Sequence, residues 1–296
     1  MNILVTGANG QLGTEMRLLS CSHPKHQYFF ADVAIPDGDE DKIYALDITD
    51  EKALKSFVCE KQINCIVNCA AYTNVDRAEE DEATALRINA DGVASLAKAA
   101  AEYGVRIVHI STDYVFSGDE HEPCRETDAV APRTAYGRTK LQGERMLQTI
   151  CPDAIIIRTA WLYSPFGNNF VKTMLRLAQD HDTLRVVFDQ IGSPTYAADL
   201  AGAVFAAIES EQWHAGIYHF TNEGVCSWYD FTHEIMRQTG KQVKVLPILS
   251  SEYAYRTPRP HYSVLDKAKI KATFQLSIPH WTESLHHCLS RLNSNI

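Results

Sequence analysis

The sequence predicts a doubly wound α/β protein, in which helices cover both faces of a parallel sheet, with a smaller, discontinuous C-terminal lobe. Three observations lead to this prediction. Short apolar segments alternate with segments of helical period through the first half of the chain. A glycine-rich turn separates the first apolar segment from the first helical one. After Ser164 the character changes, with a Pro-Phe-Gly-Asn loop and later a proline-rich stretch.

The strand candidates are short and apolar on both faces, which is typical of strands buried in a parallel sheet. They are Asn2 to Thr6, Gln27 to Ala31, Asn64 to Asn68, Val105 to Ile110 and Ala154 to Arg158. Between and after them, a 3.6-residue period predicts helices. These are Glu79 to Tyr103 with a break near Asn89, Thr134 to Thr149, Phe170 to Gln179 and Tyr196 to Glu209.

Composition and charge narrow the class of protein. Of 296 residues, 45% are hydrophobic and 22% are charged, which is ordinary for a globular chain. The net charge of -9 would repel a nucleic-acid backbone, so we expect no nucleic-acid partner. We see no secretion signal and no apolar run near the roughly 18 residues that span a bilayer. We therefore expect a cytoplasmic protein without a membrane segment.

The eight cysteines are scattered along the chain, which favours reduced thiols over a disulfide framework. Cys65 and Cys69 flank a short apolar run, INCIVNCA. Small buried side chains explain this pair better than metal ligands do. We therefore assign no metal site.

Gly7, Gly10 and Gly13 lie in TGANGQLG, directly after the first predicted strand and at the start of a helix. Glycine permits a tight turn and a close approach of the backbone, and a helix N-terminus offers free N–H groups to a pyrophosphate. A plain strand-to-helix turn is the alternative. The strand and helix context favours a Rossmann-type dinucleotide site that includes Gln11 and Leu12.

Asp32 ends the second predicted strand, where a carboxylate accepts hydrogen bonds from the adenosine ribose. It should repel a 2'-phosphate and so favour NADH over NADPH, unless Arg17 or Lys25 reaches the site. We expect Asp47 and its neighbour Ile48, in ALDITD, to flank the adenine. The alternative for Asp47 is a turn or a helix cap.

These motifs divide the chain into a dinucleotide-binding domain over residues 1–163 and a mainly substrate-binding lobe over residues 164–296. We expect the first domain to take up a further segment around residues 190–220, with Gly216 to Phe220 returning to the main sheet.

Tyr136 and Lys140 share one face of a predicted helix. An ammonium beside a phenol stabilises the phenolate and lowers a pKa that is ordinarily about 10, which suits acid–base chemistry. Thr112 ends the fourth strand, at the sheet edge where such folds bind ligands, and its hydroxyl is placed to polarise a carbonyl. Ser111 is the alternative, and we expect only one of the two to face the site. Otherwise these groups would be a surface pair and backbone caps.

Together the segments TGANGQLG, NCAAYTNVDRAE, STDYVFSG, AYGRTK and RTAWLY resemble the extended short-chain dehydrogenases/reductases. The runs QIGSPTYAADLA, SWYDF and RTPRPHYS extend the resemblance over nearly the whole chain. These later runs are similar to those of the dTDP-4-dehydrorhamnose reductase family.

The resemblance implies that Thr112, Tyr136 and Lys140 are catalytic. Tyr136 would protonate the C4 oxygen of a sugar as hydride arrives, while Lys140 would hold the nicotinamide ribose. Thr112, Asp113 and Trp161 would contact the sugar. For Trp161, a core aromatic near a strand end is the alternative.

The resemblance further implies that Ala71, Tyr72 and Thr73 contact the cofactor. The implied reaction is NADPH- or NADH-dependent reduction of a C4 ketone on a nucleotide-linked 6-deoxy sugar, by a monomer or homodimer. Some relatives use Mg²⁺, for which no ligand motif stands out. The alternatives are a non-catalytic protein like the regulatory subunit of methionine adenosyltransferase, and another nucleotide-sugar reductase or epimerase.

Overall fold

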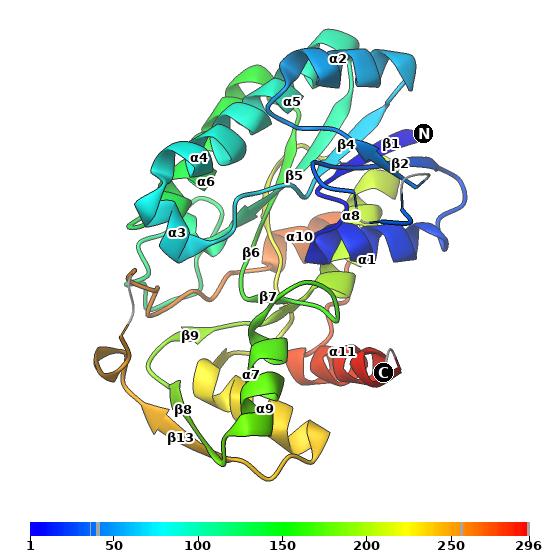
Figure 1. Ribbon diagram of the computed structural model, residues 1–296. Helices are drawn as coiled ribbons and strands as arrows, with labels where there is room; N and C mark the ends of the chain where they lie inside the picture. Colours follow the sequence, from blue (N-terminus) through cyan, green and yellow to red (C-terminus); the bar gives the residue numbers. More distant parts are fainter. Residues whose placement is uncertain (36, 40–41, 255–256, 295–296) are drawn as a thin grey trace.

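A seven-stranded parallel sheet forms the larger part of the molecule (Figure 1). The computed structural model describes residues 1–35, 37–39, 42–254 and 257–294. The strand order is β11-β6-β5-β4-β1-β2-β3, so the chain starts near the middle and winds outward in both directions. All carboxyl ends of the strands therefore meet at one edge, where doubly wound folds bind their ligands. The predicted fold class is confirmed.

The strands lie within one or two residues of the predicted segments at each end. They are β1 (Asn2–Thr6), β2 (Gln27–Asp32), β4 (Cys65–Asn68), β5 (Arg106–Thr112) and β6 (Ile155–Thr159). The segment that we expected to return to the sheet forms the edge strand β11 (Gly216–His219), parallel to β6. The other edge strand, β3 (Ile43–Ala45), was not predicted, because two of its three residues are exposed and it lacks an apolar pattern.

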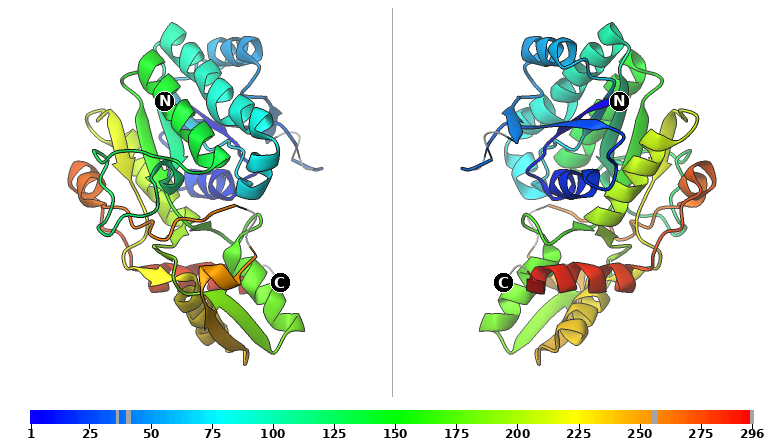
Figure 2. Two further views of the ribbon diagram at one scale, coloured as in Figure 1. Left: turned by 90° about the vertical axis from the view of Figure 1, so that its left-hand side faces the viewer. Right: turned by 90° about the vertical axis from the view of Figure 1, so that its right-hand side faces the viewer.

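Helices pack against both faces of the sheet (Figure 2). One face is covered by α1 (Gln11–Ser20), α8 (Ala197–Glu209) and α10 (Ala268–Phe274). The other face is covered by α2 (Glu51–Glu60), α5 (Gly92–Tyr103) and α6 (Ala135–Ile150). In β1, Ile3 and Val5 join the first core and Leu4 joins the second. This burial on both faces explains why the strands read as continuous apolar runs.

The predicted helix from Glu79 to Tyr103 is divided into several pieces. They are α3 (Val75–Glu80), α4 (Glu82–Leu86), a π-helical turn η1 (Arg87–Asp91) and α5. Asn89, near the expected break, lies within the π-helical turn. Its side chain bonds the backbone of Tyr72 in both directions, which fixes this turn against the loop that follows β4. Such π turns are frequent at functional sites.

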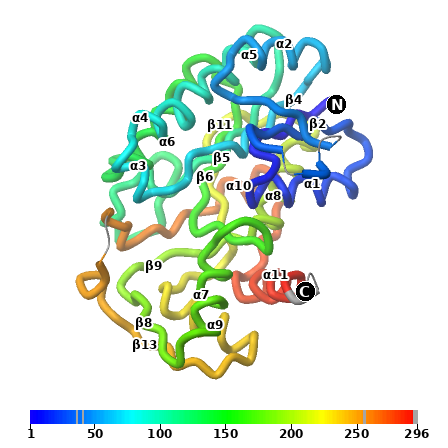
Figure 3. The backbone as a smooth tube through the Cα atoms, viewed as in Figure 1, coloured from blue at the N-terminus to red at the C-terminus, as the bar shows by residue number. Residues whose placement is uncertain are grey.

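The smaller lobe lies beyond the carboxyl edge of the sheet and surrounds a core of its own (Figures 1 and 3). Its helices are α7 (Phe170–Asp180), α9 (Trp228–Thr239) and α11 (Trp281–Ser294). Its two-stranded sheets pair β8 (Thr183–Val187) with β13 (Lys244–Ile248), β10 (Thr195–Tyr196) with β7 (Leu162–Tyr163), and β12 (Cys226–Ser227) with β9 (Ile191–Gly192). The 3-10 turns η2 (Asp113–Val115) and η3 (Ser250–Glu252) complete the described elements.

The chain crosses between the two parts several times. Segment 257–261, which follows the smaller lobe, returns to the sheet edge near Tyr114. Arg256, the first residue of the expected proline-rich stretch, lies outside the described residues. The domain boundary at residue 163 stays a prediction. In the described part of the chain, no helix combines the length and apolar character needed to span a bilayer.

Candidate active site

A cavity of about 1000 Å³ opens at the carboxyl edge of the sheet. It is lined by the glycine-rich turn at one end and by α6 and the ends of β5 and β6 at the other. The predicted site residues that line it are Gly7, Gly10, Gln11, Leu12, Asp32, Asp47, Ile48, Ala71, Thr73, Thr112, Asp113, Tyr136, Lys140 and Trp161. Its volume is at the upper end of the range for cofactor sites.

The glycine-rich turn leaves little room for side chains at its glycine positions. Gly7 has a φ of +67°, and a Cβ there would lie 2.6 Å from the backbone nitrogen of Ala70. Gly10, the N-cap of α1, lets the backbone face the cavity, and the first turn of α1 contains no acidic residue. Unpaired N–H groups therefore point to where a pyrophosphate would lie. Gly13 does not line the cavity; it packs against Gly7 and Ala8 and lets the helix approach the turn.

Asp32 lines the cavity but already has a structural partner. Its carboxylate accepts a hydrogen bond from the backbone N–H of Asn9 at 2.9 Å. Arg17 also reaches this end, where it donates to the Asn9 side chain and pairs with Asp39 at 3.3 Å. The guanidinium therefore lies close to the turn that holds Asp32. Arg17 is thus one of the two residues expected to weaken the preference for NADH over NADPH if it reached the site. No contact of Lys25 with this region is found among the described residues.

Asp47 combines both of the interpretations considered for it. It lines the cavity, and its carboxylate also accepts the N–H of Thr49 at 2.8 Å, which closes a turn before α2. In the loop after β4, Ala71 and Thr73 line the cavity. Tyr72 does not line it: its backbone is bonded to Asn89, and its side chain packs against a small cluster of buried alanines.

Thr112 and Asp113 lie where β5 turns into η2. The Thr112 hydroxyl donates to Asp113 at 3.0 Å and accepts from the N–H of Tyr114 at 3.2 Å. Burial raises the pKa of Asp113 to about 7, and its Oδ2 has no hydrogen-bond partner. Ser111 also lines the cavity, and its buried hydroxyl has no hydrogen-bond partner. The expectation that only one of the two side chains faces the site stays a prediction.

Tyr136 and Lys140 project from the first two turns of α6. This helix starts at Thr134, whose side chain accepts the N–H of Gly137. Burial raises the pKa of Tyr136 to about 12, and the neighbouring Thr112 side chain opposes this more weakly. The expected lowering of the phenol pKa by Lys140 is therefore not found: loss of solvation is the main influence on this pKa, and Lys140 is not one of the groups that shift it. The phenol keeps its proton near neutral pH, as a proton donor must.

Lys140 is 2% exposed, although it carries an amine. It donates to the backbone carbonyl of Ile110 at 2.7 Å, and burial lowers its pKa to about 8. A buried amine with a pKa near neutrality is typical of functional sites. The structure thus brings Thr112, Tyr136 and Lys140 to one wall of the cavity.

A second cavity of about 350 Å³ adjoins the first and shares Tyr114 and Trp161 with it. Trp161 stacks on Trp228 with ring centroids 3.5 Å apart. Arg185 and Arg259 also line this space. An aromatic wall and two guanidinium groups suit a ligand that carries both a flat ring and phosphates.

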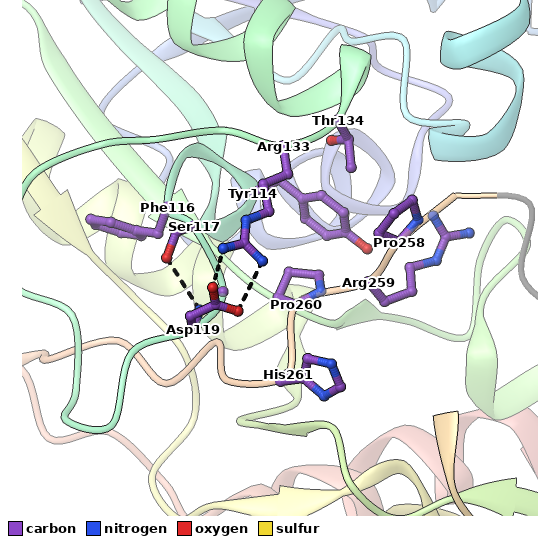
Figure 4. Close-up of a pocket in the computed structure, with 11 residues that line it drawn as sticks. Tyr114, Phe116, Ser117, Asp119, Arg133, Thr134, Pro258, Arg259, Pro260 and His261 are labelled. Carbon is purple, nitrogen blue, oxygen red and sulfur yellow. Dashed lines mark hydrogen bonds and ion pairs between the residues drawn. The ribbon is translucent and has the colours of Figure 1, made fainter. Parts of the chain in front are cut away.

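A smaller pocket lies behind Tyr114, whose ring points toward Pro258 and Arg259 (Figure 4). Arg259 donates to Asp76 of α3 at 2.9 Å. Arg133 and Asp119 form an exposed ion pair at the rim. The Arg259–Asp76 contact thereby fastens segment 257–261 to α3 beside this pocket.

Several residues of the site escaped the sequence patterns. Arg87 and Ile88 of the π-helical turn line the cavity, as do Gly167 and Asn168 of the loop before α7. His109 and Asn68 lie beneath Lys140 within the sheet. The only sequence signal for the last two was a polar side chain inside an apolar strand.

Metal ligands do not gather anywhere in residues 1–35, 37–39, 42–254 and 257–294. No group of three or more His, Cys, Asp or Glu side chains is close enough to hold an ion. All eight cysteines are free, and Cys65 is buried in the sheet. Nothing in the site therefore supports Mg²⁺.

Comparisons with known proteins agree with this geometry. The family model described as RmlD substrate binding domain matches residues 1–294. The dTDP-4-dehydrorhamnose reductase of Aggregatibacter actinomycetemcomitans is 40% identical over 294 residues, which covers 96% of each chain.

Solved structures of proteins with this name are also similar to this chain. The dTDP-4-dehydrorhamnose reductase of Clostridium acetobutylicum is 44% identical and superposes with a TM-score of 0.91, covering 99% of this chain and 100% of the other. The enzyme of that name from Bacillus anthracis, solved in complex with NADP, is 36% identical with a TM-score of 0.88, covering 98% and 99%.

Proposed function

This chain belongs to the RmlD substrate binding domain family, and on that premise we propose that it reduces the C4 ketone of dTDP-4-dehydro-6-deoxy-L-mannose to dTDP-L-rhamnose. NADPH or NADH is the reductant. One observation carries the proposal: Thr112, Tyr136 and Lys140 line the same cavity as the glycine-rich turn. A dinucleotide seated on that turn extends toward the three side chains.

The cofactor end needs only what the chain already provides. The N-terminus of α1 meets the pyrophosphate, while Asp32, Asp47 and Ile48 surround the adenosine. Ala71 and Thr73 lie along the path to α6. The nicotinamide supplies a hydride to the ketone carbon.

At the reacting end, Tyr136 donates its proton to the ketone oxygen as negative charge develops there. Its raised pKa keeps the proton in place until the oxygen becomes basic. Thr112 lies beside the phenol and orients the carbonyl by a hydrogen bond, and Asp113 binds a sugar hydroxyl with its unpartnered oxygen. Lys140 binds the nicotinamide ribose, and in its ammonium form it stabilises the phenolate left behind.

The second cavity suits the nucleotide part of the substrate. Trp161 and Trp228 offer flat apolar surfaces to the base or sugar, and Arg185 and Arg259 offer positive charge to the diphosphate. This local charge is needed because the chain as a whole is acidic.

We also propose that the protein acts in the cytoplasm as a monomer or homodimer, without Mg²⁺. Both proposed ligands are multiply charged, so neither crosses a bilayer unaided. The metal-free mechanism rests on the hydroxyl and amine groups of the cavity, which already supply the acid and the positive charge.

The test is oxidation of NADPH or NADH, followed by its near-ultraviolet absorbance, with purified protein and a panel of 4-keto nucleotide sugars. We expect turnover with dTDP-4-dehydro-6-deoxy-L-mannose and one cofactor consumed per product. An epimerase would recycle its cofactor and change the sugar without net oxidation. If no sugar is either reduced or epimerised, the non-catalytic alternative replaces the enzyme.

A further inference from the structure

A chain of buried polar groups runs across three adjacent strands and ends at Lys140. Thr6, Asn68 and His109 occupy neighbouring register positions on β1, β4 and β5. Thr6 donates to Asn68 at 2.7 Å, Asn68 contacts Nδ1 of His109 at 2.9 Å, and Nε2 of His109 lies 3.4 Å from Nζ of Lys140. Thr6, Asn68, His109 and Lys140 are each at most 2% exposed.

The direction of these hydrogen bonds is fixed by one backbone group. The N–H of Ala70 lies 3.1 Å from the Asn68 side chain, and a backbone N–H can only donate. That atom of Asn68 is therefore the amide oxygen, and its NH₂ group faces His109. Because an NH₂ group also only donates, Nδ1 of His109 must accept and carries no proton. The remaining proton of the neutral ring then lies on Nε2, which faces Lys140.

An N–H group directed at an ammonium is unfavourable, since both groups are donors and the partly positive hydrogen of the N–H faces a positive charge. A neutral amine has a lone pair that accepts the same N–H, while its own hydrogens still reach the carbonyl of Ile110. We propose that His109 is a positioning residue whose Nε2–H group favours the uncharged amine of Lys140 in the free protein. Asn68, held by Ala70, fixes His109 in the tautomer that does this.

The other charged and titratable groups around Lys140 do not supply this effect. Glu144, one turn further along α6, attracts the ammonium, but it is bound to Arg158 at 2.7 Å. Cys69 on the loop after β4 keeps its proton, because burial raises its pKa to about 12. Tyr136 also stays protonated, with a pKa of about 12. Burial lowers the pKa of His109 itself, so the ring is neutral.

The proton balance of the reaction gives this arrangement a consequence. The ammonium of Lys140 stabilises the phenolate that Tyr136 becomes after donating its proton, and the ammonium fraction falls as pH rises through the pKa of Lys140, about 8. Activity should therefore fall on the alkaline side at that point. Burial lowers the pKa of Lys140 toward physiological pH, and a contact that favours the amine moves this limb in the same direction.

The experiment measures the free protein by NMR and does not depend on turnover. Nitrogen-15 shifts of His109 should show an unprotonated Nδ1 and a protonated Nε2 throughout the range in which the protein is folded. The His109→Asn variant keeps an acceptor for Asn68 and removes Nε2–H. In this variant the titration midpoint of Lys140, followed by lysine carbon-13 shifts, should rise by about one pH unit. In the active enzyme the alkaline limb should move upward with it.

His219→Asn is the matched control, since His219 is equally buried in the same sheet, on β11, and contacts Cys124 instead of Lys140. It should leave the Lys140 midpoint in place. A proton on Nδ1 of wild-type His109 would overturn the proposal even if the variant fails to fold. So would a Lys140 midpoint that His109→Asn leaves unchanged or lowers. The inference rests on the proposed role of Lys140, but the tautomer and the midpoint are measured without substrate, so inactivity alone would refute the function and not this contact.

Discussion

Lys140 and Trp161 line the same cavity, but the chain holds them in different ways. Lys140 stands in a regular helix and is bonded to the backbone of β5. Trp161 lies in the short link between β6 and β7 with a φ of 49°, and it stacks on Trp228 from a distant segment. A residue other than glycine whose backbone lies in the left-handed region stores strain of about 1–3 kcal/mol, which the surrounding packing must offset. We call the wall around Lys140 the polar end of the cavity and the wall around Trp161 the aromatic end. The polar end, held by hydrogen bonds, is suited to chemistry, whereas the aromatic end is suited to recognition.

Tyr136→Phe should have the largest effect, because it removes the proton donor and leaves the ring in place. We expect kcat to fall by about 10²- to 10⁴-fold with little change in cofactor affinity. Steady-state kinetics and cofactor titration measure the two quantities. Tyr163→Phe is the control, since Tyr163 is buried outside the cavity and its hydroxyl has no partner. A Tyr136→Phe enzyme with near-normal kcat, when chemistry is rate-limiting, would show that the proton comes from elsewhere.

Lys140→Met should come next, and it should differ in kind. The methionine fills the space of the lysine stem but removes the amine, so both phenolate stabilisation and ribose binding are lost. We expect kcat to fall by about 10²-fold and the KM for the cofactor to rise. Lys267→Met removes another buried amine, outside the cavity, and should change neither. If Lys140→Met lowers kcat but leaves the cofactor KM unchanged, Lys140 does not bind the ribose.

Trp228→Leu should affect only the aromatic end. Loss of its stacking on Trp161 should raise the KM for the nucleotide sugar by about 2- to 10-fold, since such ring pairs contribute about 0.5–1.5 kcal/mol. The cofactor KM should stay the same. The control is Trp213→Leu, because the indole of Trp213 lies away from both cavities and donates to the carbonyl of Asp153. Equal losses of sugar and cofactor binding would mean that the two ends of the cavity are not separable.

Asp32→Asn should have the smallest effect, a change in cofactor preference. It removes the negative charge but keeps an oxygen that accepts the N–H of Asn9. Asp32→Ala would remove both the charge and this acceptor. We expect wild-type turnover with NADH to be at least comparable with NADPH, and the variant to shift toward NADPH by about 2- to 5-fold. The ratio of the two kcat/KM values measures this. Strong NADPH specificity in the wild type would show that Arg17, or another donor, outweighs the carboxylate.

The polar end was the more predictable of the two from sequence. Its residues lie in regular elements or directly beside them: Gly7 and Gly10 follow a strand, and Lys140 follows Tyr136 by one helical turn. Local spacing determines where such residues point. Sequence spacing could not reveal that Asn68 and His109 are neighbours, because that depends on the register between separate strands.

The aromatic end depends on tertiary structure to a greater degree. Trp161, Arg185 and Trp228 meet only because separate segments of the smaller lobe fold over the sheet edge. Trp161 was identified through the family resemblance. Trp228 lies in the run SWYDF but was not assigned to the site, and Arg185 carried no local signal. The raised pKa of Tyr136 was missed for the same reason, since burial is a property of the folded chain.

Glu15, on the first helix after the glycine-rich turn, is 2% exposed, and its carboxylate accepts from Ser164 at 2.8 Å and pairs with Arg291 at 2.8 Å. Arg291 belongs to α11, near the other end of the chain. A protein cut short before Arg291 would therefore leave the buried Glu15 carboxylate with Ser164 as the remaining one of these two partners, inside the helix that follows the glycine-rich turn. If that turn holds the dinucleotide as proposed, loss of the last helix should weaken dinucleotide binding before any sugar is present.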